Sequence, residues 1–264
     1  MDVTWNYSEQ GHGPLIVFLP GWGLPSLVWK ETAEWLAPHY QVICADWPNA
    51  EQQADWTAFT LDHVIASLKN RVDRPAVWIG WSLGGMWATA LAAQYPEHTA
   101  GLVTIASLPS FIARPDWPCG MPATRLEEFF SQFEQDYRGT LERFIALQLR
   151  FSKKLISGRL YLRSYFSVNP LPSKSALTFG LDCLRHLDLR AQLTQLLCPT
   201  LMLFGERDAL VNPQGADAVL AIAPHLNCCV LPAAGHLPFI SHPDEFRAAL
   251  GDFLRVASLS PATH

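Results

Sequence analysis

The chain has 264 residues, of which 49% are hydrophobic and 16% charged, and its formal net charge is −5. This length is enough for one large α/β domain, with or without an insertion. The acidic balance argues against a general nucleic-acid binder, and no apolar run reaches the roughly 18 residues that a membrane-spanning helix needs.

The N-terminal segment and the cysteines suggest a protein of the cytoplasm. The first residues, MDVTWNYSEQGHG, have no basic start and no apolar stretch, so we expect no signal peptide. None of the six cysteines forms a C-x-x-C pair, and most lie in apolar runs, where a reduced and buried thiol is expected. We therefore expect a cytoplasmic protein. We also expect a monomer with no membrane partner.

Six short hydrophobic runs have the composition of strands that are buried on both faces of a parallel sheet. Helix-type runs separate most of them, which is the pattern of β-α-β units. The strand-type runs are 14–21, 40–47, 75–82, 99–107, 199–208 and 226–236, and the helix-type runs are 26–39, 57–72, 84–96, 213–224 and 243–258. The pattern predicts an α/β fold with a mostly parallel, doubly wound sheet.

The alternation stops between about residues 108 and 198. After a stretch with four prolines, LPSFIARPDWPCGMP, only helix-type runs follow, at 124–151, 153–166 and 174–187. We predict a helical cap at 108–198, inserted into a core formed by 1–107 and 199–264. Aromatic residues recur there at helical spacing, so the apolar side of the cap is expected to line a pocket. These residues include Phe129, Phe130, Phe133 and Phe144.

The motif Gly80-x-Ser82-x-Gly84 stands where a strand-type run meets a helix-type run. A turn this tight leaves no room for side chains two residues before and after the serine, and it exposes the serine hydroxyl at the carboxyl edge of the sheet. This context predicts a nucleophilic serine. The alternative is an ordinary glycine-rich turn between a strand and a helix.

A serine hydroxyl is a weak nucleophile and needs a base, which an acid orients. In folds with this motif the acid and then the histidine follow the serine along the chain. His236 lies on the loop after the last strand-type run, whereas His242 lies at a helix start and is better explained as a surface or capping residue. Asp208 and Glu206 both follow the strand-type run 199–208, and we favour Asp208 because it lies further past the strand end.

The anionic intermediate of acyl transfer needs two N–H donors. One is the backbone amide of Leu83, which directly follows the serine at a helix start. The other is predicted to be the backbone amide of Trp22, in the loop Gly21-Trp22-Gly23 after the first strand-type run. Trp22 could instead be only an aromatic wall of the pocket, and the two roles are compatible. No H-E-x-x-H, paired C-x-x-C or Walker motif is present, so we expect no metal and no nucleotide cofactor.

Several local stretches carry a closer resemblance. They are GWGL, GWSLGG, LVTIAS, FIARPDWP, LERFIALQ and PFISHP. With them the chain resembles the α/β-hydrolase superfamily, and within it the family of pimeloyl-[acyl-carrier protein] methyl ester esterases, which are carboxylesterases of biotin synthesis. FIARPDWP and PFISHP are far more specific than the serine motif, because the general fold does not require them.

The resemblance implies a catalytic triad and a set of substrate-binding residues. The implied triad is Ser82, Asp208 and His236. The substrate is implied to be an acyl ester carried by acyl carrier protein, and the residues that meet it are Trp22, Ser82, Leu83, Phe144, Ile145, Ala146, Leu147, Gln148 and His236.

The chain departs from the family pattern in two loops near the expected pocket mouth. Relatives commonly have His-Gly before the oxyanion tryptophan, where this chain has Pro20-Gly21. They also have a glycine-rich loop after the second core strand, where this chain reads DWPNAEQQADW from Asp46 on. Neither change touches the implied triad, so both bear on substrate preference.

The segment from Arg138 to Arg163 is basic, although the chain is acidic overall. It has seven basic residues and one acid, Glu142. Such a patch in the cap would suit an acidic carrier protein that delivers an acyl chain. We predict that Arg138, Arg143, Lys153, Lys154 and Arg159 dock the carrier, together with Arg150 and Arg163 of the same segment. A solvated helix face balanced by acids elsewhere is the alternative.

The leading hypothesis is a serine carboxylesterase acting on the methyl ester of pimeloyl-acyl carrier protein. A broad-specificity esterase for short free acyl esters, or a related hydrolase such as a peptidase or thioesterase, has the same motif. A non-catalytic binding module of the same fold is a third hypothesis, against which the intact nucleophile, acid and base argue.

Overall fold

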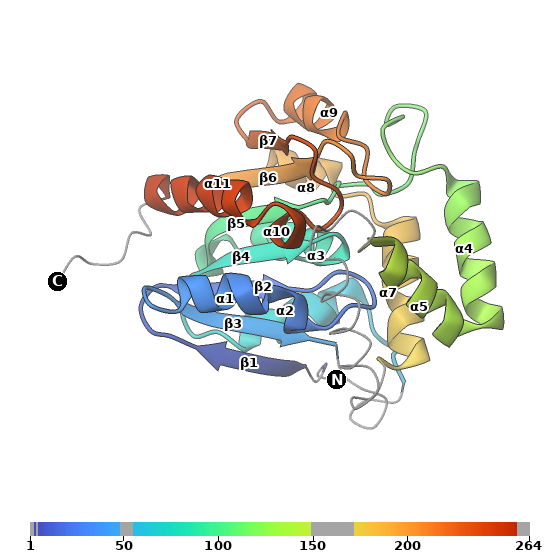
Figure 1. Ribbon diagram of the computed structural model, residues 1–264, viewed down its shortest axis with the longest axis horizontal. Coiled ribbons are helices and arrows are strands. Elements are labelled where there is room, and N and C mark those ends of the chain that lie inside the picture. The colour runs from blue at the N-terminus through green and yellow to red at the C-terminus, as the bar shows by residue number, and fades with distance from the viewer. Residues whose placement is uncertain (1–2, 4, 48–54, 149–171, 258–264) are drawn as a thin grey trace.

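The computed structural model describes residues 3, 5–47, 55–148 and 172–257, and seven strands in these residues form one sheet (Figure 1). The order across the sheet is β1-β3-β2-β4-β5-β6-β7. All the strand pairings are parallel except that of β1 with β3. The strands are β1 (Asn6–Gln10), β2 (Leu15–Leu19), β3 (Gln41–Asp46), β4 (Ala76–Trp81), β5 (Thr99–Ile105), β6 (Thr200–Gly205) and β7 (Asn227–Leu231).

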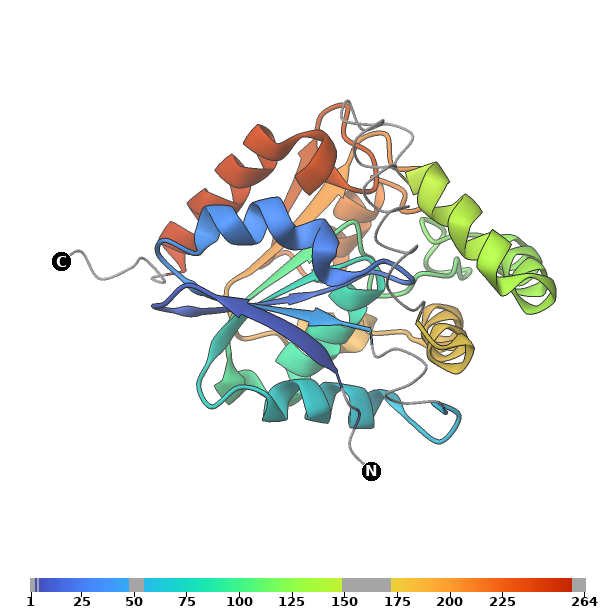
Figure 2. The same cartoon turned by 60° about the horizontal axis from the view of Figure 1, so that its bottom comes forward.

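The central strands are hydrophobic throughout because helices cover both faces of the sheet. Every residue of β2, β4 and β6 is buried. Figure 2 shows α1 (Lys30–Leu36) and α11 (Pro243–Val256) on one face, and α2 (Leu61–Asn70) and α3 (Leu83–Gln94) on the other. The predicted fold class, a mostly parallel and doubly wound α/β sheet, is confirmed.

Strand β1 is an addition to the elements predicted from the sequence. Its residues, NYSEQ, are half-buried or exposed, because β1 lies at the sheet edge and pairs antiparallel with β3. An edge strand of this kind has no continuous hydrophobic run, and therefore lacks the signal that marks the central strands.

The strand order reverses beside β2. The chain runs from β2 to β3 on one side and then crosses to β4 on the other side of β2. In open α/β sheets, ligands bind at such a switch point, outside the carboxyl ends of the two strands. The pairing of Leu19 with Gly80 brings the ends of β2 and β4 together there.

Four helices lie between β5 and β6 in the described residues: α4 (Ala123–Gln135), α5 (Tyr137–Gln148), α7 (Lys174–His186) and α8 (Arg190–Thr194). In both ribbon views α4 and α7 lie beyond one end of the sheet, and Figure 1 shows α5 beside them. Helix α8 instead packs against α3 of the core. The cap boundaries at 108 and 198 therefore remain a prediction, and the run 153–166 lies outside the described residues.

An ion-paired clasp joins the segment that enters this insertion to the segment that leaves it. Ser110 and Asp188 form a β-bridge, and Arg190 contacts the carboxylates of Asp188 and Asp116 at 2.7 and 2.8 Å. The guanidinium of Arg114 lies 3.4 Å from Asp188. The residues of the FIARPDWP stretch thus help to fasten the base of the insertion.

The remaining helices are short connections and peripheral elements. They are η1 (Ser26–Trp29), η2 (Pro96–His98), α9 (Gly215–Ile222) and α10 (Pro238–Ser241).

Candidate active site

Ser82 occupies a strained turn between β4 and α3. Its backbone has φ 55° and ψ −119°, in a region that residues with a side chain rarely adopt. The Ser82 amide donates to the carbonyl of Ile105 at 2.8 Å, which holds the turn against the neighbouring strand β5. Strain of this kind persists only where the surrounding structure fixes it, and it is characteristic of functional sites.

The two glycines of the motif are required by close backbone approaches. A Cβ at Gly80 would lie 2.2 Å from the carbonyl oxygen of Gly84, and a Cβ at Gly84 would lie 2.5 Å from that of Pro20. Both distances are far below van der Waals contact. The two positions must therefore be glycine if the strand, the turn and the helix are to pack this closely.

His236 and Asp208 meet beside the turn. The Nδ1 atom of His236 lies 2.7 Å from Oδ2 of Asp208, and both side chains are almost fully buried. A carboxylate can only accept, so the proton is on Nδ1 and Nε2 is left as the basic nitrogen. Nε2 is buried and has no hydrogen-bond partner among the described residues. The backbone amides of Leu210 and Val211 donate to Oδ1 of Asp208 at 2.8 and 3.1 Å, which fixes the carboxylate.

The two alternatives considered from the sequence lie elsewhere. Glu206 accepts from the backbone amide of Ala233 at 2.7 Å, so its carboxylate braces a loop. His242 is the residue before α11, and its Nδ1 lies 2.9 Å from the Ser241 hydroxyl. The structure therefore brings Asp208, and neither alternative, to His236.

The histidine is held in place by a tryptophan of β4. The indole N–H of Trp81 donates to the backbone carbonyl of His236 at 2.8 Å, and the two rings lie 5.4 Å apart. Because Trp81 directly precedes Ser82, one strand end positions both the serine and the histidine loop.

The two expected amide donors lie just after the paired ends of β2 and β4. Leu83 is the first residue of α3, so its N–H has no acceptor within the helix. Trp22 lies on the loop after β2, where Gly23 has φ +72° and Gly21 packs against the ring of Trp81.

The side chain of Trp22 connects this loop to the inserted helices. Its indole N–H donates to the carbonyl of Leu177 on α7 at 2.8 Å. Its ring lies 5.2 to 5.5 Å from three phenylalanine rings, those of Phe129 and Phe133 on α4 and Phe144 on α5. Trp22 is thus buried where α4, α5 and α7 meet the loop. Its side chain can form a wall of the pocket while its backbone amide serves as the predicted oxyanion donor.

A cavity of about 350 Å³ opens above Ser82, between the sheet end and the inserted helices. Its volume is in the range of small-molecule sites. Most of its lining is apolar or aromatic. Ser82 and Trp22 belong to it, and the other lining residues are Phe111, Met121, Arg125, Leu126, Phe129, Gln132, Thr140, Arg143, Phe144, Leu147, Leu181, Leu184, Ala209 and Leu210.

Two members of the implied 144–148 segment, Phe144 and Leu147, line this cavity. Ile145 and Gln148 are on the buried side of α5, and Ala146 is half-buried. A helix presents only one side to the cavity, so five consecutive residues cannot all line it.

Sequence reasoning missed several lining residues, notably Arg125 and Gln132 on α4. They lie four residues before and three residues after Phe129, so they share its side of the helix. This helical spacing from Phe129 was the sequence signal that could have identified them as lining residues.

Two of the residues predicted to dock a carrier lie in the described part of the chain. Arg138 stacks over the ring of Tyr137 at 5.7 Å, and Arg143 lies 3.4 Å from the carboxylate of Asp136. Both are exposed on α5. The other predicted docking residues, Arg150, Lys153, Lys154, Arg159 and Arg163, lie outside the described residues.

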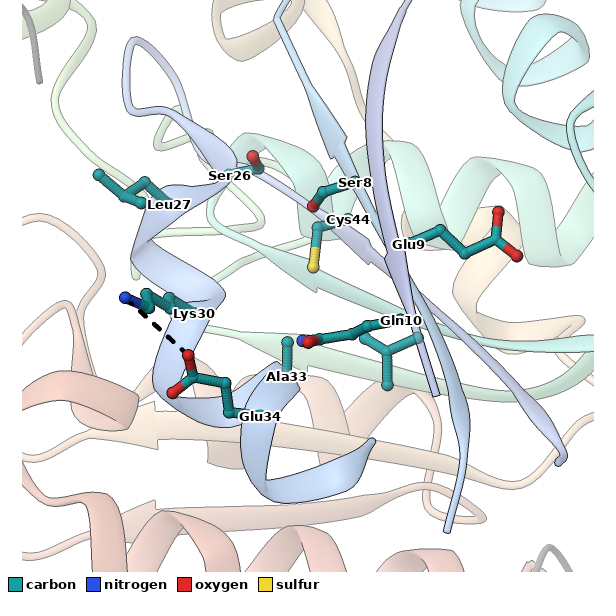
Figure 3. Close-up of a pocket in the computed structure, with 10 residues that line it drawn as sticks. Ser8, Glu9, Gln10, Ser26, Leu27, Lys30, Ala33, Glu34 and Cys44 are labelled. Atoms are coloured by element: carbon teal, nitrogen blue, oxygen red, sulfur yellow. Dashed lines mark ion pairs between the residues drawn. The ribbon is translucent and has the colours of Figure 1, made fainter. Parts of the chain in front are cut away.

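A separate hollow of about 330 Å³ lies between β1, β3 and the start of α1, and it shares no residue with the cavity above Ser82. Figure 3 shows the ion pair of Lys30 and Glu34 at its side and the thiol of Cys44 pointing into it. Burial raises the pKa of Cys44 to about 12, so this thiol is not a nucleophile at neutral pH.

All six cysteines are free thiols. Within the described residues, no group of three or more histidine, cysteine, aspartate or glutamate side chains could hold a metal ion. No helix in that part of the chain is long and apolar enough to cross a membrane.

The sequence model described as "alpha/beta hydrolase fold" matches residues 14–243, which is most of the chain. The chain belongs to the α/β-hydrolase family. Solved structures of other proteins show the same fold as this hydrolase. An esterase from Exiguobacterium antarcticum superposes with a TM-score of 0.84 at 18% identity, covering 95% of both chains. A bromoperoxidase from Bacillus anthracis gives 0.83 at 22% identity, covering 94% of both chains.

Some relatives share a higher sequence identity with this hydrolase than these solved structures do. A protein from Xanthomonas oryzae pv. oryzae, named pimeloyl-[acyl-carrier protein] methyl ester esterase, is 39% identical over 92% of this chain and 96% of its own. A protein of the same name from Edwardsiella ictaluri is 37% identical over 95% of this chain and 96% of its own. The resemblance stated from local motifs is therefore confirmed over nearly the whole length.

Proposed function

We propose that this hydrolase cleaves the methyl ester of a pimeloyl chain that is carried on acyl carrier protein, a reaction of biotin synthesis. The named relatives, which cover nearly the whole chain, support this substrate. The chain is a carboxylesterase. The observation that carries the chemical part of the proposal is the buried pair of His236 and Asp208 beside the strained turn of Ser82.

In the proposed reaction Ser82 attacks the ester carbonyl. Nε2 of His236 accepts the hydroxyl proton, and Asp208 orients the imidazole and stabilises its protonated form. The backbone amides of Leu83 and Trp22 bind the oxyanion of the tetrahedral intermediate. His236 then gives its proton to the departing methoxide, which leaves as methanol, and the acyl group remains on Ser82.

Water completes the cycle. His236 removes a proton from a water molecule as that water attacks the acyl-enzyme, and it returns the proton to Ser82 as the free acid leaves. The products are methanol and a chain with a carboxylate in place of its methyl ester. These steps use side chains and backbone amides of the chain alone.

The cavity and the exposed arginines support the choice of substrate. The apolar lining suits methylene groups, and a volume of about 350 Å³ is too small for a whole carrier arm, which must leave through the mouth. Arg138 and Arg143 are exposed on α5, a helix that lines the cavity through Arg143 and other residues, so both can attract an acidic carrier to this helix. We propose that they dock it, together with the basic residues of the same segment outside the described residues.

We also place the reaction in the cytoplasm and treat the enzyme as a monomer. The six free cysteines suit a reducing compartment.

Turnover of two substrates tests the proposal. The wild-type enzyme is expected to release methanol from pimeloyl-acyl carrier protein methyl ester with a much higher kcat/KM than from the free methyl ester, and Ser82→Ala is expected to release none from either. Equal efficiency on both substrates would favour a broad-specificity esterase. Activity that survives in Ser82→Ala would refute the proposed nucleophile.

Charge reversal tests the docking part. Arg138→Glu is expected to lower the ratio of carrier-bound to free ester turnover by about fivefold at low salt, since an exposed charge contributes at most about 1 kcal/mol, and by less at high salt. Arg255→Glu is the matched control, because Arg255 is exposed on α11, at the opposite side of the molecule (Figure 1). A ratio that is the same in both variants would refute docking at Arg138.

A further inference from the structure

The charged residues that line the cavity above Ser82 both come from the inserted helices. Its polar lining residues other than Ser82 come from α4 and α5, namely Arg125, Gln132, Thr140 and Arg143. No acidic side chain is among the described lining residues. The cavity is therefore mostly apolar, and its positive charge comes from the two inserted helices.

One of the two arginines has its hydrogen-bonding capacity partly taken up. Arg143 lies 3.4 Å from the Asp136 carboxylate and donates to the Thr140 hydroxyl at 2.8 Å. The charge of Arg143 is therefore partly compensated by Asp136, the residue that precedes α5.

Arg125 differs in this respect. Its guanidinium makes no hydrogen bond and no ion pair with any described residue, and the side chain is exposed in the first turn of α4. Two acids of the same helix are engaged elsewhere: Glu127 pairs with Arg185 at 3.1 Å, and Glu134 pairs with Lys174 at 3.1 Å. Arg125 is thus a cation of the cavity that forms no ion pair with a described residue, although the exposed Glu128 lies three residues further along the same helix.

A second hollow of about 230 Å³ adjoins the cavity and shares Arg125 with it. Asp208 also lines this hollow, but its side chain is almost fully buried and its carboxylate oxygens already accept hydrogen bonds from His236 and from two backbone amides. Met121 and Leu210 also line both hollows, so the border between the hollows includes apolar side chains as well as Arg125. An anion at the border could thus contact Arg125 while its chain lies among apolar groups.

We propose that Arg125 binds a carboxylate at the far end of the acyl chain, and that the enzyme therefore hydrolyses free methyl half-esters of dicarboxylic acids in preference to uncharged methyl esters. The inference rests on the proposed function, since it assigns the reacting ester to Ser82. A guanidinium matches a carboxylate in shape and can donate two parallel hydrogen bonds to it. The apolar lining between Ser82 and Arg125 takes the methylene chain.

Chain length becomes a selectivity factor under this proposal. The ester carbon must reach Ser82 while the carboxylate reaches Arg125, so one spacing fits best. A chain that is too short leaves the carboxylate buried and unpaired, which is costly, and a longer chain carries it past the guanidinium. The preference is therefore expected to peak at one dicarboxylic acid and to fall on both sides.

The experiment compares two series of free esters: methyl half-esters of the dicarboxylic acids from succinate to sebacate, and methyl esters of monocarboxylic acids of the same lengths. At low salt the wild type is expected to prefer the best half-ester over its uncharged counterpart by about fivefold in kcat/KM, which corresponds to about 1 kcal/mol. The preference should reside in KM and should shrink as salt is added.

Three variants separate the explanations. Arg125→Met is expected to lose the preference, and Arg125→Lys to keep part of it, because an ammonium retains the charge without the planar fork. Arg185→Met is the matched control, since Arg185 is an exposed arginine that pairs with Glu127 and does not line the cavity. It should keep the full preference.

Four results would overturn the inference: no half-ester preference in the wild type at any length, the same preference in Arg125→Met, an equal loss on both ester series, or a loss confined to the carrier-bound substrate. The last would assign Arg125 to the carrier instead. In each case the proposed function stands as long as the wild type still hydrolyses the carrier-bound ester through Ser82. If the enzyme shows no Ser82-dependent turnover of any methyl ester, both the proposed function and the inference about Arg125 are refuted.

Discussion

The glycine at position 84 offers a quantitative test of how the serine turn is built. A Cβ at Gly84 would lie 2.5 Å from the carbonyl oxygen of Pro20 and 2.6 Å from that of Leu19. Ordinary contact begins at 3.4 Å, so the helix start and the loop after β2 must separate by about 0.9 Å in a Gly84→Ala variant. Because both opposing atoms belong to the backbone, no side chain can turn away to make room.

That shift acts on stability and on activity together. Overpacking of this kind costs about 1–3 kcal/mol, and a chain of this size loses about 2–4 °C of Tm per kcal/mol. The same shift moves Ser82 and Leu83 relative to the loop that holds Trp22, and a misplacement of about 1 Å can cost about 100-fold in rate. We expect Gly84→Ala to melt at a lower temperature and to lose about two orders of magnitude in kcat/KM.

The matched control is Gly251→Ala. Gly251 lies inside α11, and the nearest atom to a Cβ there is 4.0 Å away, on the ring of Trp35. Alanine in a helix interior should stabilise the protein by about 0.5–1 kcal/mol and leave activity unchanged. Thermal melts and p-nitrophenyl ester hydrolysis measure both variants. A Gly84→Ala protein as stable and as active as the wild type would refute this account of the turn.

Three further predictions concern other parts of the molecule. Trp22→Phe keeps the backbone amide but loses the hydrogen bond to α7, so steady-state kinetics should show a raised KM with little change in kcat; a lower kcat with unchanged KM would contradict this. Arg190 lowers the pKa of Asp188, so the pair stabilises the fold above the ordinary carboxyl pKa and loses that effect as pH falls through the lowered value. Arg190→Met should therefore reduce Tm at neutral pH, and the difference from wild type should vanish in strong acid; a constant difference would argue against the pair. Burial raises the pKa of both Cys44 and Cys183 to about 12, so iodoacetamide should spare them in the native protein and label them after denaturation, as peptide mass spectrometry can show; rapid native labelling would contradict their burial.

The parallel core could be predicted because burial on both faces leaves a strong sequence signal. Strands such as β2 and β4 must be hydrophobic at every position, and their short continuous runs reveal them. Strand β1 could not be found in this way, because it is exposed at the sheet edge and is ordered by pairing with β3. Its residues have no pattern that distinguishes them from a polar loop.

The geometry around the serine was partly predictable for a different reason. Gly80 and Gly84 are separated by a fixed spacing because the turn brings their backbones together. A contact between residues this close in sequence can be predicted from a short motif. Arg125 illustrates the opposite case. It lies far from Ser82 in the sequence, and only the packing of α4 over the sheet end brings it to the cavity. The sequence could show that Arg125 and Phe129 lie on the same side of a helix. It could not show that this side faces the cavity above Ser82.

The clasp at the base of the insertion also depends on tertiary structure. Arg114 and Asp116 are separated by more than 70 residues from their partners Asp188 and Arg190. The FIARPDWP stretch could be recognised as specific to a family, but its ion pairs become visible only when both segments of the chain are placed.

The central claim is that Ser82 carries the acyl group during hydrolysis. The most direct measurement is to mix the enzyme with the carrier-bound methyl ester, quench in acid within the first turnovers, and locate the acyl adduct by peptide mass spectrometry. The account predicts a pimeloyl-type adduct on the peptide that contains Ser82, and no adduct in Ser82→Ala. Methanol release from the wild type with no adduct on Ser82, or with an adduct on another residue, would contradict it.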